Sequence, residues 1–95
     1  MRVEWSGRAL AERDAIFDFI VAERPKAAEL IDQRIFEQVH LLGRFPCLGR
    51  LGRVPGTREL VIHETPFVVS YKIGDDAIRV LRILHSSRRW PGGGR

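Results

Sequence analysis

The spacing of apolar residues changes once along this chain, near residue 57, and the change separates a helical first half from a β-rich second half. Within residues 7–22 and 26–42 apolar side chains recur every three or four positions, a spacing that predicts amphipathic helices. Only a short connection joins the two segments, so we expect an antiparallel helical hairpin. The first stripe comprises Leu10, Phe17 and Val21, with Ala9, Ile16 and Ile20 beside it, and the second comprises Ala28, Ile31, Ile35, Val39 and Leu42.

From residue 57 onward β-branched and aromatic residues dominate, and turn-forming residues divide them into three short runs. These runs predict strands over 57–62, 67–73 and 77–84, and a glycine followed by two aspartates predicts a hairpin turn between the last two. A further short strand is predicted at residues 1–5. The expected order is β-α-α-β-β-β, an α+β fold in which the helical hairpin packs on one face of a small, mostly antiparallel sheet.

The segments between these elements carry their own signals. Ser6 precedes the first helix and is suited to cap it. Residues 44–56 are rich in glycine, proline and arginine, which predicts a loop rather than a helix or strand. Such a loop is long for a small domain, and long loops are often functional.

The composition is that of a soluble protein with one domain. The chain has 95 residues, of which 44% are hydrophobic and 29% charged. We assign residues 1–91 to a single domain followed by a disordered tail at 92–95. No apolar run approaches the roughly 20 residues of a membrane helix, and the N-terminus lacks the apolar core of a signal peptide. Cys47 is the only cysteine, which excludes an internal disulfide and a cysteine-rich zinc site and makes the cytoplasm the expected location.

The net charge of +4 conceals an uneven distribution. Residues 1–43 carry six basic and eight acidic side chains, whereas residues 44–95 carry ten basic and four acidic ones. Most of the basic residues in the second half are arginines, whose planar guanidinium groups match phosphate and carboxylate. A basic half joined to a near-neutral one indicates a polyanionic or acidic partner.

The last predicted strand is followed by a histidine, His85, which is the candidate general acid or base because histidine exchanges a proton near neutral pH. Arginine would stabilise the phosphorane that forms in metal-free RNA cleavage. The alternative for His85 is a structural histidine hydrogen-bonded to the backbone. No metal-ligand set and no cofactor motif is present. The further catalytic candidates are Arg58, Arg88 and Arg89, and the substrate-binding candidates are Arg50, Arg53, Arg82 and Trp90.

Strand periodicity adds three expectations about side-chain direction. Arg79 and Arg82 lie three apart on one strand, so they are expected on opposite faces of the sheet. Arg82 shares its face with apolar residues and is expected to be partly buried and paired. Tyr71 is expected in the core.

Five segments follow one another in a recognisable order along nearly the whole chain. They are the helical hairpin, Phe45-Pro46-Cys47-Leu48-Gly49-Arg50, Pro55-Gly56-Thr57-Arg58-Glu59-Leu60, Val69-Ser70-Tyr71-Lys72-Ile73, and Val80-Leu81-Arg82-Ile83-Leu84-His85 followed by Arg88-Arg89-Trp90. Taken in this order, they resemble the RelE/ParE superfamily of bacterial toxins. The resemblance implies the toxin half of a type II toxin–antitoxin pair, in a hetero-oligomer with a small antitoxin that wraps over it. We expect the antitoxin segment to be acidic or amphipathic and to cover the sheet and the arginine-rich rim.

This superfamily is known for two activities. RelE-like members cut messenger RNA in the ribosomal A site, and ParE-like members poison DNA gyrase. The chain lacks the RelE-type lysine pair, with Arg58 near that position, and lacks the C-terminal tyrosine, for which Trp90 is the nearest aromatic residue. The first hypothesis is a ribosome-dependent mRNA endonuclease that uses His85. The alternatives are a non-catalytic gyrase poison and a small basic nucleic-acid-binding or adaptor domain.

Overall fold

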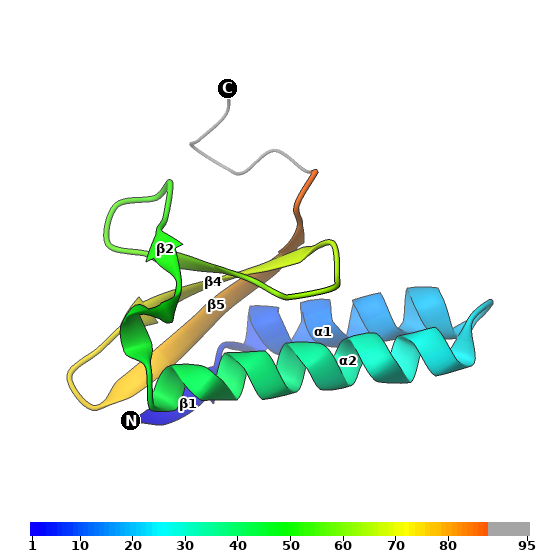
Figure 1. Ribbon diagram of the computed structural model, residues 1–95, viewed down its shortest axis with the longest axis horizontal. Helices are drawn as coiled ribbons and strands as arrows, with labels where there is room; N and C mark the ends of the chain where they lie inside the picture. The colour runs from blue at the N-terminus through cyan, green and yellow to red at the C-terminus, as the bar shows by residue number, and fades with distance from the viewer. Residues whose placement is uncertain (88–95) are drawn as a thin grey trace.

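A computed structural model of the chain describes residues 1–87 and shows two helices packed on a five-stranded sheet (Figure 1). The predicted tail 92–95, together with Arg88, Arg89 and Trp90, lies outside the described residues. The elements are β1 (Arg2–Trp5), α1 (Gly7–Val21), α2 (Pro25–His40), the 3-10 turns η1 (Leu41–Gly43) and η2 (Pro46–Leu48), β2 (Arg50–Leu51), β3 (Arg58–Val61), β4 (Phe67–Ile73) and β5 (Ala77–His85).

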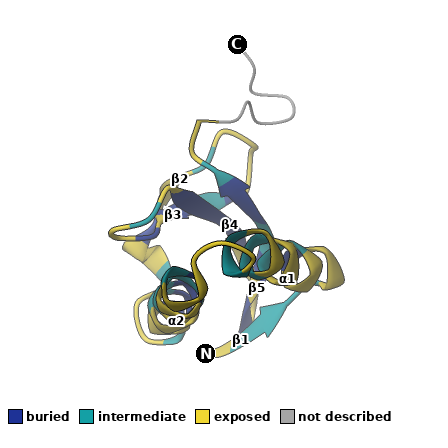
Figure 2. Cartoon of the chain, turned by 90° about the vertical axis from the view of Figure 1, so that its right-hand side faces the viewer, coloured by how far each residue is buried: buried dark blue, intermediate teal, exposed yellow. Residues whose placement is uncertain are grey.

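The sheet has the strand order β1-β5-β4-β3-β2. The β1 strand runs parallel to β5, and the other three pairs are antiparallel. Both helices lie on the same face of the sheet, and Figure 2 shows the buried strands behind helices whose outer surfaces are exposed. The predicted α+β class, the helical hairpin and the mostly antiparallel sheet are therefore confirmed.

Local sequence explains where the helices begin. The Ser6 side chain accepts a hydrogen bond of 3.0 Å from the backbone N–H of Ala9, which satisfies one of the free donors at the start of α1. Pro25 occupies the first position of α2, where its missing N–H has no cost. The second helix is shorter than the predicted 26–42, because its last turn tightens into η1.

The core lies between the helices and the inner face of β3, β4 and β5. The predicted stripe of α2 is confirmed, with Ala28, Ile35 and Val39 buried. The prediction for α1 is partly wrong, because Leu10 of the predicted stripe is 45% exposed. The buried residue of this helix is Ala9, which was predicted to lie beside the stripe. That helix carries apolar residues on most of its circumference, so periodicity alone did not identify the buried side.

A β-bulge in β5 overturns the prediction for Arg79 and Arg82. Arg82 pairs with Ser70 and Arg79 pairs with Lys72, with a register shift between Ser70 and Tyr71. Residues that pair directly point to the same side of a sheet, and Ser70 and Lys72 are two positions apart, so both arginines start from the same face of the sheet. The inserted residue reversed the alternation on which the prediction depended.

The segment 44–56 is more regular than predicted. It contains η2 and the two-residue strand β2, which pairs antiparallel with β3 through Arg50–Glu59 and Leu51–Arg58. The prediction of a loop without helix or strand was wrong here, because elements of two or three residues are too short to give a periodic signal.

Candidate functional site

The predicted arginines fall into separate groups in the fold. Arg50 and Arg53 both contact Glu59 of β3, whose side chain is 2% exposed. The Arg50 Nη2 atom lies 3.2 Å from Glu59 Oε1, and the Arg53 backbone N–H donates to Glu59 Oε2 over 3.0 Å. A buried carboxylate requires such partners. Glu59 therefore fixes the segment from Arg50 to Arg53 on β3 and neutralises part of the positive charge of these two arginines.

The Arg58 side chain binds the backbone of the same segment, residues 46–53. Its Nη1 atom donates to the Gly49 carbonyl oxygen over 2.7 Å. Beside it, the Gly49 N–H donates to the Tyr71 hydroxyl over 2.9 Å, and that hydroxyl donates to the Pro46 carbonyl oxygen over 2.7 Å. Tyr71 is fully buried, as expected, and burial raises the pKa of its hydroxyl. The described geometry gives Arg58 a structural contact.

Arg82 is partly buried and paired, as expected. Its Nε and Nη2 atoms both donate to Glu12 Oε2 of α1, over 3.0 and 2.7 Å. The other carboxylate oxygen, Oε1, accepts the backbone N–H of Ile83 over 2.8 Å. Because β1 pairs with β5 only as far as Val80, Glu12 takes the place of a strand at the remaining edge.

His85 is the last residue of β5 and is half-buried. Its ring meets the Phe67 ring edge-on, with 5.7 Å between centroids. Its Nδ1 atom lies 2.7 Å from the Ser87 hydroxyl and 3.2 Å from the Ser87 backbone nitrogen, which donates to it. These contacts match the structural alternative for this histidine, and they leave Nε2 as the ring nitrogen for which the described residues show no hydrogen bond.

The strand register separates His85 from Arg58. His85 pairs with Phe67 and Arg58 pairs with Tyr71, four residues further along β4. At about 3.3 Å per residue, these positions are roughly 13 Å apart along the strand. Within residues 1–87 the predicted acid or base is thus not joined by the arginine proposed to stabilise the phosphorane. The site assignments of Arg88, Arg89 and Trp90 stay predictions, since these residues lie outside the described part of the chain.

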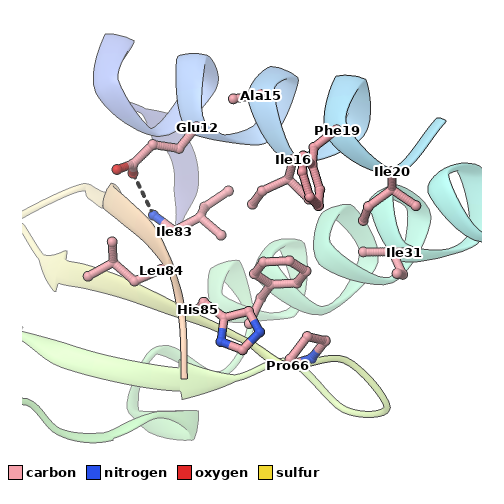
Figure 3. A pocket seen from close by; sticks show the side chains of 11 residues that line it. Glu12, Ala15, Ile16, Phe19, Ile20, Ile31, Pro66, Ile83, Leu84 and His85 are labelled. Atoms are coloured by element: carbon pink, nitrogen blue, oxygen red, sulfur yellow. Dashed lines mark hydrogen bonds between the residues drawn. The ribbon is translucent and has the colours of Figure 1, made fainter. Parts of the chain in front are cut away.

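A groove of about 510 Å³ opens beside His85 (Figure 3). It lies between the second half of α1, Ile31 of α2, the start of β4 and the end of β5. In Figure 3 side chains of α1 and α2 line one wall, and Pro66 and His85 lie across from them. The Glu12–Ile83 hydrogen bond closes one end. Most of the lining is apolar: Ala15, Ile16, Phe19, Ile20, Ile31, Pro66, Phe67, Ile83 and Leu84. Phe19 is 84% exposed, which is unusual for so large an apolar side chain.

Two features of the site were missed by the sequence predictions. Glu12 was not identified as the partner of Arg82, and nothing in the local pattern of α1 marks one acidic residue among several. The groove was also missed, although Phe19 lies outside both apolar stripes and gave the one available signal. No group of three or more His, Cys, Asp or Glu residues able to hold a metal occurs within residues 1–87. Among the same residues, neither helix has the length and hydrophobicity that a membrane-spanning segment requires.

Comparisons with known proteins agree with the resemblance predicted from the sequence. A family model for the ParE toxin of type II toxin–antitoxin systems matches residues 3–90. The putative toxin Y4kP of Sinorhizobium fredii is 37% identical over 90 residues, which cover 95% of this chain and 93% of that protein. Toxin RelE2 of Caulobacter vibrioides is 36% identical over 87 residues, covering 92% and 97%. A solved structure described as the chromosomal ParDE toxin–antitoxin system from P. aeruginosa superimposes with a TM-score of 0.81 at 34% identity, covering 90% and 95% of the two chains.

Proposed function

Because the chain belongs to the ParE toxin family of type II toxin–antitoxin systems, we propose that this toxin inhibits growth by binding a protein target, DNA gyrase, and not by cutting RNA. The observation that carries the proposal is the separation, within residues 1–87, of His85 from the candidate arginines described there. Arg82 is paired with Glu12, and Arg58 donates to a backbone carbonyl. His85 of β5 pairs with Phe67, at the end of β4 away from Arg58. General acid–base catalysis needs its groups within hydrogen-bonding reach of one reacting centre.

Gyrase is proposed as the target on the basis of the family. The ParE model matches nearly the whole chain, and poisoning of gyrase is the activity that the resemblance implies for ParE-like members. Gyrase acts on chromosomal DNA, so the proposal places the toxin in the cytoplasm.

The test is a brief pulse of toxin expression in growing cells. We expect double-strand DNA breaks and induction of the SOS response before any loss of messenger RNA. New RNA 5′ ends at ribosome-bound codons, without DNA breaks, would show that the proposal is wrong.

RNA cleavage remains the second candidate, because His85 lies half-buried at a groove with one ring nitrogen not hydrogen-bonded in the described structure. A His85→Ala variant separates the two. If His85 is a general acid or base, the variant should cut RNA about 10²–10⁴-fold more slowly at an unchanged melting temperature, and growth arrest should weaken. A binding toxin should keep its growth arrest.

The family also implies an antitoxin partner. We propose that an amphipathic antitoxin segment enters the groove beside α1, with apolar side chains against Ile16, Phe19 and Phe67. Unmatched apolar surface of this kind commonly marks a protein interface. The sequence-based prediction had the antitoxin covering the sheet and the arginine-rich rim; the present proposal narrows the contact to the groove at the start of β4 and the end of β5.

A further inference from the structure

We infer that residues 44–57, named here the 44–57 loop, form a second docking surface that takes an acidic protein surface with apolar pockets. The inference rests on the proposed function in one respect, since the protein docked there is the toxin's target. The loop connects α2 to β3 and carries η2 and β2. In Figure 1 the part of the loop before β2 rises from the end of α2, and the turn after β2 projects from the sheet on the side away from α1 and α2.

The backbone of the loop is fixed by side chains that the strands provide. Tyr71 and Arg58 hold Pro46 and Gly49, and Glu59 holds Arg53. A Cβ atom on Gly49 would lie 2.7 Å from the Tyr71 ring, so only glycine permits this approach. The loop is therefore pre-organised, and binding through it does not require the cost of ordering a flexible segment.

The same loop presents its apolar side chains to solvent. Four of them are large apolar residues that are at least 42% exposed, and none belongs to the core cluster of the described residues. Leu51 has the largest exposed fraction, and it lies on β2, an edge strand whose outer side has no neighbour in the described sheet. The exposed fractions are 53% for Phe45, 51% for Leu48, 78% for Leu51 and 42% for Val54.

Charge identifies the kind of partner. Residues 44–57 contain three arginines, Arg44, Arg50 and Arg53, and no acidic residue. Glu59 offsets one of these charges from below the loop. Exposed arginines interleaved with leucines and a phenylalanine match an interface with a protein, since arginine and aromatic residues are enriched at such sites. The complementary surface must carry carboxylates around apolar pockets.

This surface is separate from the groove. The groove lies along β5 and α1, and β2 is at the opposite edge of the sheet, beyond β4 and β3. A change in the 44–57 loop should thus affect the target and spare the antitoxin.

The experiment compares Leu51→Glu with Leu30→Glu. Both replace an exposed leucine by the same charged residue, and Leu30 is 47% exposed on α2, outside the groove lining. Growth arrest is scored in cells, and affinities for purified DNA gyrase and for the cognate antitoxin are measured in vitro. We expect Leu51→Glu to lose growth arrest and to bind gyrase at least about tenfold more weakly. Leu30→Glu should match the wild type in both, and both variants should melt and bind antitoxin as the wild type does.

Three results would overturn the inference. The first is growth arrest by Leu51→Glu equal to that of the wild type. The second is a loss of antitoxin affinity in Leu51→Glu, which would assign the loop to the antitoxin. The third is toxicity that is lost in Arg44→Gln and kept in Leu51→Glu, as for a nucleic-acid partner held by charge alone. Failure of the wild type to bind gyrase would refute the proposed target, while the growth comparison would still decide the role of the loop.

Discussion

Glu12 joins α1 to β5 through a single carboxylate, which accepts hydrogen bonds from the Arg82 side chain and the Ile83 backbone. Replacing it by alanine leaves a partly buried guanidinium and an edge N–H without their acceptor. We expect Glu12→Ala to lower the free energy of unfolding by about 1–3 kcal/mol. The matched control is Glu4→Ala, which removes exposed ion pairs with Arg2 and Arg79 and should cost clearly less than Glu12→Ala. Urea denaturation measures both, and equal losses would contradict the role given to Glu12.

Tyr71 holds two backbone groups of the 44–57 loop with one hydroxyl, so Tyr71→Phe should cost about 1–3 kcal/mol and loosen that loop. Burial also raises the pKa of this hydroxyl above its ordinary value of 10.0. The folded chain then holds the proton more tightly than the unfolded chain. The stabilisation is complete below pH 10.0 and is lost as the pH rises through the folded-state pKa. The difference in unfolding free energy between wild type and Tyr71→Phe should therefore shrink in alkali, and a constant difference would refute the linkage.

At the scale of elements, α1 presents one face to the core and an exposed aromatic residue to the groove. Phe19→Glu should reduce antitoxin affinity at least about tenfold, because it removes a large apolar anchor and places a charge beside an apolar wall. Leu10→Glu is the control, since Leu10 is 45% exposed on the same helix and lies outside the groove lining. Isothermal titration with the cognate antitoxin measures both, and an equal loss in the control would count against the groove.

The elements show which parts of the fold follow from the sequence. The second helix, β4 and the hairpin turn were predicted because their periods are long and their stop signals clear. The bulge in β5 and the two-residue strand β2 were not, since each depends on pairing with a distant strand and not on local spacing. The position of His85 at a strand end was correct, whereas the partners of the arginines required the tertiary structure.

At the scale of the whole molecule, positive charge is concentrated in the second half of the chain. Electrostatic attraction of this kind speeds encounter with an acidic partner and is screened by salt. We expect the association rate with the antitoxin to fall as salt is raised from low to physiological concentration, as stopped-flow mixing would measure. A rate that ignores salt would mean that the arginines do not steer binding.

The most direct test of the central claim is the effect of the purified toxin on purified DNA gyrase. The account predicts that the toxin, in the presence of ATP, causes gyrase to accumulate cleaved plasmid DNA, and that added antitoxin prevents this. Gyrase that is unaffected by a folded toxin, when the same toxin cuts messenger RNA on ribosomes, would contradict it.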